Sequence, residues 1–211
     1  MASSAAKPSP KVISFVNLKG GVGKTTLAVS YASYLGKTQK KRVLVVDLDP
    51  QTNTSFWVMG FNEWKEHESK KGTVADLMGA TAQNRIGKNT KTIKDIVYKS
   101  SSFGFDLIPS NVSLYTMDLD LANVPMKEVK LKRAVDACDT PYDYVICDCP
   151  PNLTIPTQNA LALSTHYVVP ISLDYFSSIG IGLLKSRVVK LGEDLDNQPK
   201  LGGIVITRAG S

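Results

Sequence analysis

A glycine-rich turn between an apolar run and a helical pattern constrains this chain more than any other feature. The turn has the sequence Lys19-Gly20-Gly21-Val22-Gly23-Lys24-Thr25-Thr26. The apolar run Val12–Val16 before it predicts a buried strand, and the residues after it have the spacing of one helix face: Ala28, Tyr31, Ala32 and Leu35. A strand, a glycine-rich turn and a helix start predict a phosphate cradle, because backbone N–H groups and the helix dipole both attract an anion there.

The turn departs from the strict phosphate-loop pattern at one position. That pattern has a glycine five residues before Gly23, where this chain has Leu18, and Lys19 adds a second lysine at the head of the loop. In such a loop we expect Lys24 to reach the terminal phosphates and the Thr25 hydroxyl to bind magnesium. The alternative is a glycine-rich turn with solvated lysines, but the flanking strand and helix favour nucleotide binding.

The bulk properties are those of a globular protein. With 211 residues the chain can form a sizeable core, and no apolar run approaches the roughly 20 residues that cross a bilayer. We expect residues 1–10 to be a disordered tail and residues 11–211 to form a single domain. The net charge of +6 is a modest bias toward polyanions such as nucleic acid or an acidic membrane, and solubility is its plainer explanation.

The chain contains three cysteines, Cys138, Cys147 and Cys149. They cannot make a complete set of disulfides, and the last two fall in an apolar run. We therefore expect reduced, packed thiols in a cytoplasmic protein. A metal site is the alternative, and Cys-x-Cys without further ligand spacing is a weak signal for it.

Two further apolar runs end in aspartates. Val43–Val46 leads to Asp47 and Asp49, and Tyr144–Cys147 leads to Asp148 before two prolines. Continuous apolar runs are typical of parallel strands buried on both faces, and ligands bind at the carboxyl ends of such strands. Asp148 thus has the position of a Walker B carboxylate, which holds magnesium, often through water. Asp47 and Asp49 either contact magnesium or water, or cap the turn that follows.

Strand and helix patterns alternate along the rest of the chain, although Asn62–Lys99 is less regular and includes a run of mixed charge at Trp64–Lys71. The alternation predicts an α/β fold with a mostly parallel sheet and helices on both faces. The glycine-rich loop after the first strand makes this fold similar to that of the P-loop NTPases. Further strands are expected at Phe105–Pro109, Tyr167–Ile171 and Leu201–Thr207, and helices at Thr73–Gly79, from Leu114 to Val135 with a break at Pro125, around Ala160–Leu163, and from Ile181 to Leu191.

Basic residues gather at two places outside the loop. One cluster comprises Arg85, Lys88, Lys91 and Lys94. Most clusters of this kind are solvated surface, and the alternative is that this one contacts nucleic acid. At the second place Arg187 and Lys190, three residues apart, share the more polar side of an expected helix.

The chain resembles the deviant-Walker ATPases, and in particular the ParA-type partition ATPases. The motifs that carry the resemblance are Lys19–Thr26, Asp47-Leu48-Asp49-Pro50-Gln51 and Asp148 before Pro150-Pro151. The resemblance also takes in Thr73–Gly79, Leu107–Ser110 and the turn Asp174-Tyr175-Phe176, and it runs from about Lys11 to Thr207.

The resemblance implies an ATP-dependent homodimer that binds DNA without sequence preference. Slow magnesium-dependent ATP hydrolysis, stimulated by a ParB-like or other adaptor protein, would release the DNA and move a plasmid, chromosome or other cargo. The cofactors implied are ATP and Mg²⁺, the location is the cytoplasm at the nucleoid, and no membrane is expected.

The resemblance also implies a role for each residue of the site. Lys19 is the signature lysine that reaches the nucleotide of the partner subunit, and Asp49 orients the attacking water. Lys19, Lys24 and Asp49 form the catalytic set. The metal set is Thr25, Asp148 in the outer shell of magnesium, and Asp47 nearby as a switch element. The nucleotide contacts are Lys19, Gly20, Gly21, Val22, Gly23, Lys24 on the β- and γ-phosphates, Thr25, and Thr26 on the α-phosphate.

One departure from the family concerns the end of the chain. Family members usually continue beyond the strand at Leu201–Thr207 with helices that complete the adenine pocket and carry basic DNA-contacting residues, whereas this chain stops at Ser211. We expect either a truncated or compact form, or DNA contact through other residues, such as Arg187 and Lys190 or the cluster of residues 85–94.

Three alternatives remain open. A MinD-type membrane-associated positioning ATPase shares the motifs, although no amphipathic membrane helix is visible. A redox enzyme like the nitrogenase iron protein shares the loop but needs cluster-ligating cysteines outside the Walker elements. A structural module with a dead site is the third, and it is disfavoured because the reactive set is complete: Lys24, Thr25, Asp49 and Asp148.

Overall fold

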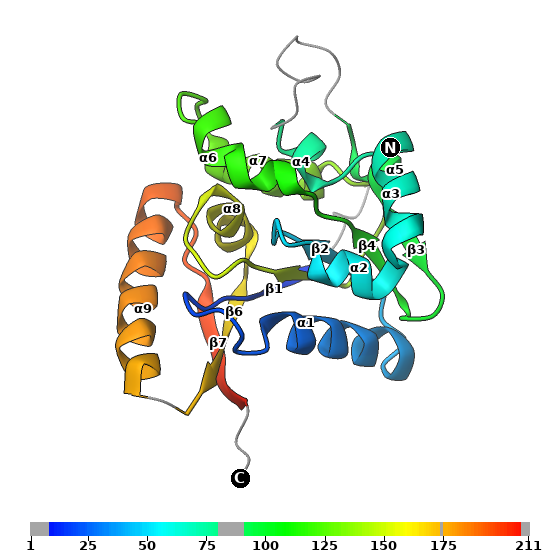
Figure 1. Cartoon of the computed structure of the whole chain (residues 1–211). Helices are drawn as coiled ribbons and strands as arrows, with labels where there is room; N and C mark the ends of the chain where they lie inside the picture. Colours follow the sequence, from blue (N-terminus) through cyan, green and yellow to red (C-terminus); the bar gives the residue numbers. More distant parts are fainter. Residues whose placement is uncertain (1–8, 80–90, 174, 208–211) are drawn as a thin grey trace, which may run out of the picture.

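A seven-stranded sheet forms the centre of the structure, with the strand order β3-β4-β2-β5-β1-β6-β7 (Figure 1). The structure, a computed structural model, describes residues 9–79, 91–173 and 175–207, with the backbone alone for 175–179. The expected tail up to residue 8 and the predicted residues Arg85, Lys88 and Asp174 lie outside the described part. Only β3 and β4 pair antiparallel in the described sheet, so the predicted mostly parallel sheet is confirmed.

Helices connect the strands in the alternation that the sequence predicts, except between β3 and β4, which a short turn joins. The strands are β1 (Lys11–Phe15), β2 (Val43–Asp47), β3 (Tyr98–Ser100), β4 (Phe105–Ile108), β5 (Tyr144–Asp148), β6 (His166–Ser172) and β7 (Lys200–Thr207). The α-helices are α1 (Lys24–Ser33), α2 (Asn53–Met59), α3 (Phe61–Lys70), α4 (Val74–Leu77), α5 (Ile93–Ile96), α6 (Met117–Asp120), α7 (Lys130–Asp136), α8 (Ile155–Leu163) and α9 (Tyr175–Leu195). Short turns of other helix types are η1 (Tyr34–Thr38), η3 (Val112–Thr116) and η4 (Lys127–Val129).

Alternate residues of the strands contribute to two separate hydrophobic cores, because successive side chains of a strand point to opposite faces. Leu44 and Val46 belong to the core that includes residues of α4 to α9. Val43 and Val45 belong to the core that includes residues of α1, α2 and α3. Figure 1 shows α1 below the sheet and α4, α7 and α8 above it. Helices therefore cover both faces of the sheet, as predicted.

The strand order brings the carboxyl ends of β1, β5 and β2 together. Phe15, the last residue of β1, lies opposite Asp148, the last residue of β5. Asp148 in turn lies opposite Asp47, the last residue of β2. Because these strands are parallel, the segments that follow them leave the sheet at one edge, where open α/β sheets bind ligands. The glycine-rich turn after β1 is therefore next to Asp148.

The first part of the stretch that begins at Asn62 is more regular than the sequence suggests. Residues up to Lys70 belong to α3, in which Trp64 and His67 are the buried residues. Two buried residues are too few to give the sequence a recognisable helical periodicity. Likewise, β3 is a three-residue antiparallel strand at the edge of the sheet, too short to produce a clear alternation.

The predicted helical region from Leu114 to Val135 has its break at Pro125 as expected, but each half consists of two short pieces. The structure has four short pieces there, η3, α6, η4 and α7. Met126, directly after Pro125, has a φ of 56°, a left-handed conformation that no helix can continue through. The apolar spacing reflects burial of these pieces against one core rather than one continuous helix.

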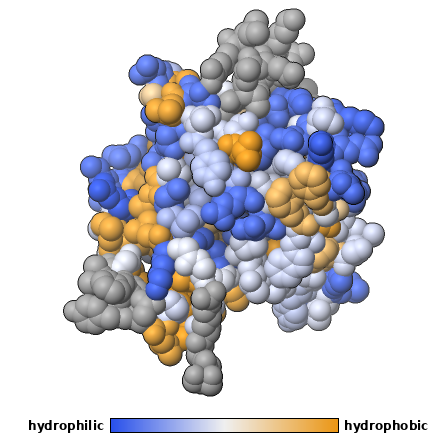
Figure 2. Space-filling model, in the orientation of Figure 1, coloured by the Kyte–Doolittle hydropathy of each residue, from blue (hydrophilic) through white to orange (hydrophobic). Residues whose placement is uncertain are grey.

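One edge of the sheet carries apolar side chains that the described residues leave partly exposed. Leu201, Ile204 and Ile206 of β7 are 46%, 45% and 52% exposed. Figure 2 shows hydrophobic surface on the side of the molecule where α9 and β7 lie.

Across the described ranges, no helix is both long enough and apolar enough to cross a membrane, and this includes α9 with its 21 residues.

Candidate functional site

The turn after β1 has a backbone that requires glycine at two positions. Gly21 and Gly23 have φ angles of 72° and 82°, in the left-handed region that other residues avoid. Gly23 is also the cap residue of α1, so the turn ends where the first N–H groups of the helix have no partner within the helix. The backbone is therefore shaped to present N–H groups to an anion, as the sequence predicts.

Two residues outside the turn hold it in place. The Asn17 side chain is buried, accepts a hydrogen bond from the Lys19 N–H at 2.9 Å, and donates one to the Pro170 carbonyl oxygen at 2.6 Å. Thr207 Oγ1, on β7, lies 2.9 Å from the Val22 carbonyl oxygen. Neither residue was predicted from the sequence. A polar residue directly after an apolar strand and before the loop was the available signal for Asn17.

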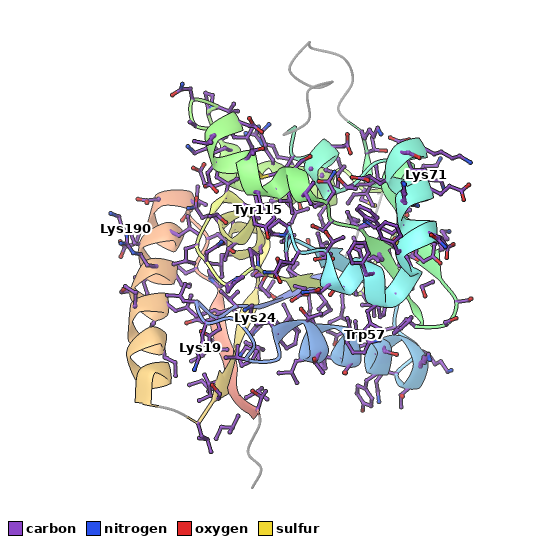
Figure 3. The ribbon with its side chains drawn as sticks, viewed as in Figure 1. Lys19, Lys24, Trp57, Lys71, Tyr115 and Lys190 are labelled. Carbon is purple, nitrogen blue, oxygen red and sulfur yellow. The ribbon has the colours of Figure 1, made fainter. Side chains whose placement is uncertain are left out.

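The two lysines of the turn lie near each other in different environments (Figure 3). Lys24 is buried, and its Nζ donates a 3.0 Å hydrogen bond to the Lys19 carbonyl oxygen. Burial lowers the pKa of Lys24, and the negative charge of Asp148 opposes that shift. The Lys19 side chain is exposed, with its Nζ 3.4 Å from Ser172 Oγ. Lys24 thus lies across its own loop, whereas Lys19 is accessible from outside the subunit.

Asp148 joins the turn to a second part of the chain. Thr25 Oγ1 donates a hydrogen bond of 2.8 Å to Asp148 Oδ2, and Thr54 Oγ1 of α2 donates one of 2.7 Å to the same oxygen. Asp148 is fully buried, and its Oδ1 has no hydrogen-bond partner in the described part of the chain. An unpaired buried carboxylate oxygen is costly, so this atom marks a position for a ligand.

Asp47 and Asp49 are tied to the segment between β2 and α2. Asp47 Oδ1 accepts a hydrogen bond from the Asp49 N–H at 3.1 Å, and its Oδ2 accepts two from Ser55, at 2.9 Å from N–H and 2.7 Å from the hydroxyl. Asp49 Oδ1 accepts one from the Gln51 N–H at 2.9 Å. Both residues therefore cap the local turn. Because protein donors engage both oxygens of Asp47, its predicted contact with magnesium would have to compete with them.

Burial raises the pKa of both Asp47 and Asp148. For Asp47 the charge of Asp148 raises the pKa further, against the hydrogen bonds from Ser55 and Asp49. For Asp148 the hydrogen bonds from the two threonines lower the pKa, and the charge of Asp49 raises it. Several carboxyl groups thus share a buried space, which favours the presence of a cation there.

The donors at this place suit magnesium. Mg²⁺ prefers oxygen ligands and is usually bound through one or two carboxylates together with water and substrate phosphates. Thr25 donates its single hydroxyl proton to Asp148, so its oxygen lone pairs stay available to a cation. Asp148 contributes the unpaired Oδ1. The residues present therefore fit magnesium beside the phosphate cradle.

The cysteines are packed as expected. Cys147 and Cys149 are buried thiols on either side of Asp148, and burial raises the pKa of Cys147 to about 12. Cys138 is half-buried. Among the residues that the structure describes, no three His, Cys, Asp or Glu side chains come together as a metal-binding group.

The predicted DNA contacts lie apart from this site, on the exposed side of α9, as Lys190 shows in Figure 3. They line a groove of about 660 Å³ whose charged residues are Arg187, Lys190, Glu128 and Asp194. A second groove, of about 620 Å³, is here called the basic groove. Its charged residues are Lys91, Lys94, Lys130, Arg133 and Asp139. It joins part of the predicted basic cluster to cations of α7 that lie too far along the chain to be connected with it by spacing.

Comparison with known proteins places this geometry in a family. The AAA domain family matches residues 10–201. Sporulation initiation inhibitor protein Soj of Bacillus subtilis is 33% identical over 200 residues, which cover 93% of this chain and 72% of Soj. Chromosome partitioning protein ParA of Myxococcus xanthus is 28% identical over 197 residues, 93% of this chain and 64% of ParA. An uncharacterised protein of Mycobacterium tuberculosis is 34% identical over 198 residues, and the chain spans only 58% of its length.

Solved structures share the fold. Cobyrinic acid a,c-diamide synthase of Mycobacterium smegmatis, solved with an ATP analogue and magnesium, has a TM-score of 0.81 and 28% identity, and the match covers 96% of this chain and 76% of the synthase. A plasmid partition protein of Borrelia burgdorferi bound to AMPPNP has a TM-score of 0.77 and 24% identity, with 97% and 78% covered. The chain, with its second loop lysine and its Thr25–Asp148 pair, therefore belongs to the AAA domain family and to the ParA/MinD superfamily of ATPases.

Proposed function

We propose that this protein is a magnesium-dependent ATPase that acts as a switch in the partition or positioning of a plasmid, a chromosome or another cargo. In the ATP state it forms a homodimer and binds DNA without sequence preference. A ParB-like or other adaptor protein stimulates slow hydrolysis, which separates the dimer and releases the DNA. The protein acts in the cytoplasm, on the nucleoid.

One observation carries the proposal. Thr25 at the start of α1 and Asp148 at the end of β5 are joined by a 2.8 Å hydrogen bond, beside a glycine-rich turn that ends in the buried Lys24. This is the arrangement that a magnesium–nucleotide complex requires. The relatives named for chromosome partitioning, and the related synthase solved with an ATP analogue and magnesium, support the same ligands here.

The residues have separate tasks in phosphoryl transfer, which depends on positioning and charge neutralisation. The N–H groups of the turn and Lys24 bind the phosphates, with Thr26 on the α-phosphate. Bound magnesium neutralises charge on the phosphate oxygens, and Thr25 and Asp148 are its protein partners. Asp49, whose carboxylate is oriented by the Gln51 N–H, holds the attacking water.

Lys19 connects the site to dimer formation. Lys24 already occupies the inner side of the loop, where its Nζ reaches the Lys19 carbonyl oxygen. The Lys19 side chain is on the exposed side. A second cation at the head of the loop is therefore suited to the nucleotide of a partner subunit, and a dimer that needs this contact forms only with nucleotide bound.

DNA binding would use one of two surfaces. The groove that contains Arg187 and Lys190 has two acidic residues among its lining, which offset the two cations. The basic groove has four cations and one acid, Asp139. Affinity for DNA depends on cations that displace counterions from phosphates, so the basic groove is the better match, and the α9 pair is the second candidate.

Co-sedimentation with DNA and with anionic liposomes, in ATP, ADP and no nucleotide, tests the function. We expect DNA to retain the protein in ATP, with binding that weakens as salt rises, and liposomes to retain none. ATP-dependent binding to liposomes would favour the MinD-type alternative. Equal DNA binding in all three nucleotide states would contradict a nucleotide switch.

A further inference from the structure

Asp148 is held by hydroxyl groups from two different parts of the chain. Thr25 reaches it from the nucleotide loop at 2.8 Å, and Thr54 reaches it from α2 at 2.7 Å. Both hydroxyls donate to Oδ2, and Oδ1 is left without a partner in the described part of the chain. The carboxylate is therefore anchored through Oδ2, while the buried Oδ1 keeps its capacity to accept a ligand.

The two threonines are not equivalent. Thr25 follows Lys24 in the loop, and its hydroxyl oxygen is itself a predicted magnesium ligand. Thr54 is fully buried and lies outside every motif recognised in the sequence. Within the described residues, the hydrogen bond to Asp148 is the one that the Thr54 side chain makes. Its hydroxyl thus serves the orientation of Asp148 alone.

The backbone that carries Thr54 is fixed independently of Asp148. The next residue, Ser55, donates both its N–H and its hydroxyl to Asp47 Oδ2. The Ser55 hydroxyl oxygen in turn accepts a hydrogen bond from the Ser110 N–H at 2.9 Å. The first turn of α2 is thereby bound to β2 and to the segment after β4. The position of the Thr54 hydroxyl is therefore fixed by its helix, and the hydroxyl can orient the Asp148 carboxylate.

The crowding of carboxyl groups gives a fixed orientation of Asp148 its value. Asp47 lies opposite Asp148 on the neighbouring strand, and both carboxyl groups are fully buried. Without a second donor on Oδ2, the Asp148 carboxyl group could turn about its side-chain bonds to lower its repulsion with its neighbours. Hydrogen-bonding partners of metal-binding carboxylates commonly set how well the metal is held.

We propose that Thr54 is a positioning residue that fixes the Asp148 carboxylate so that Oδ1 faces the magnesium of the bound nucleotide. This inference rests on the proposed function. It assigns a role to a hydroxyl in α2, between the Asp49 segment and the rest of the helix, and it makes magnesium affinity depend on the position of that helix.

Three variants separate positioning from packing. Thr54→Val removes the hydroxyl and keeps the shape, and Thr54→Ser removes a methyl group and keeps the hydroxyl. The matched control is Thr157→Val in α8, since Thr157 is also fully buried and donates a 2.7 Å hydrogen bond, to the Asn152 carbonyl oxygen. Each variant is titrated with the fluorescent nucleotide mant-ATP in EDTA and then with Mg²⁺, and its thermal midpoint is recorded.

The proposal predicts a selective effect on magnesium. Thr54→Val should raise the Mg²⁺ concentration for half-maximal tightening of mant-ATP about 10-fold or more, while the affinity in EDTA stays within about twofold of wild type. Thr54→Ser should restore the wild-type magnesium dependence, and Thr157→Val should leave it unchanged.

Four results would overturn it. An unchanged magnesium dependence in Thr54→Val removes the positioning role. An equal loss of affinity in EDTA and in Mg²⁺, which Thr54→Ser does not restore, shows a packing role instead. If Thr54→Val does not fold, Thr54→Ala and Thr54→Ser provide the comparison, and the proposal fails if these two bind Mg²⁺ equally. If wild-type protein shows no magnesium-dependent binding of mant-ATP, the proposed function falls as well.

Discussion

Asp47 and Asp148 lie directly opposite each other at the ends of β2 and β5, and consecutive residues of α2 hydrogen-bond to them. Ser55 donates to Asp47, and Thr54 donates to Asp148. The segment between β2 and α2, which contains Asp49, is therefore fixed at both ends. A carboxylate on a segment held in this way is suited to place a water molecule with little freedom.

Asp49→Asn should bind ATP and dimerise but lose hydrolysis by at least 100-fold, the size expected when a residue that orients or accepts a proton is removed. Asparagine keeps an oxygen that can accept the hydrogen bond from the Gln51 N–H, so the turn is retained. Phosphate release at saturating ATP measures the effect. Turnover within a few-fold of wild type would remove the assigned role of Asp49.

Lys19→Ala should bind ATP with nearly wild-type affinity and fail to dimerise. The reason is that the Lys19 side chain is exposed, whereas the cation inside the loop is Lys24. Analytical ultracentrifugation in ATP and in ADP measures the oligomeric state. Lys65→Ala, an exposed lysine on α3, is the control, and a Lys19→Ala protein that still dimerises in ATP would contradict the assignment.

Removal of cations from the basic groove should weaken DNA binding in ATP. Each cation that no longer neutralises a DNA phosphate should reduce the slope of log affinity against log salt by about 0.9. The triple variant Lys94→Ala, Lys130→Ala and Arg133→Ala is compared with Arg187→Ala and Lys190→Ala by fluorescence anisotropy. A larger reduction of the slope in the α9 pair would assign DNA binding to α9, and an unchanged slope in both would exclude both surfaces.

His67 should make the fold less stable in mild acid. Its Nε2–H donates a 2.8 Å hydrogen bond to the Ile96 carbonyl oxygen, and its ring packs edge-on against Tyr98. Burial lowers the pKa of His67, so the folded state binds fewer protons than the unfolded state between the two pKa values. Its contribution to stability is complete above about pH 6.5 and decreases as pH falls below that value, by at most roughly 1.4 kcal/mol per pH unit.

Urea unfolding at pH 7.5 and pH 5.5 measures this effect. His67→Gln cannot take up the proton, so the variant should lose less free energy of unfolding between the two pH values than wild type does. The buried carboxyl groups titrate in both proteins, and the difference between them isolates His67. Equal losses in the two proteins would show that His67 does not contribute.

The sequence predicted the fold and the meeting of the glycine-rich loop with the end of β5, because both depend on local patterns. The apolar runs before Gly20, Asp47 and Asp148 are strands β1, β2 and β5, and the parallel order of these strands brings their ends together. Thr25 and Asp148, 123 residues apart, are in contact as their motifs imply. Long apolar runs with motif residues at their ends leave few alternative arrangements.

The parts that escaped prediction depend on tertiary contacts. Thr54 and Ser55 look like ordinary polar residues at a helix start, and only the packing of α2 against the sheet ends shows their carboxylate partners. The basic groove combines residues of α5 and α7 that are far apart in sequence. The spacing of residues along the chain does not show which distant residues come together in the fold.

The affinity of Lys24→Met for mant-ATP tests the central claim, that this turn binds the phosphates of ATP. Methionine matches the length of lysine without the charge, and loss of one charge-assisted hydrogen bond should weaken binding about 10-fold to 100-fold. The thermal midpoint of the empty variant is recorded to show that the variant is folded. Weaker binding by a folded variant is the predicted result. Wild-type affinity in a folded Lys24→Met protein would contradict the account.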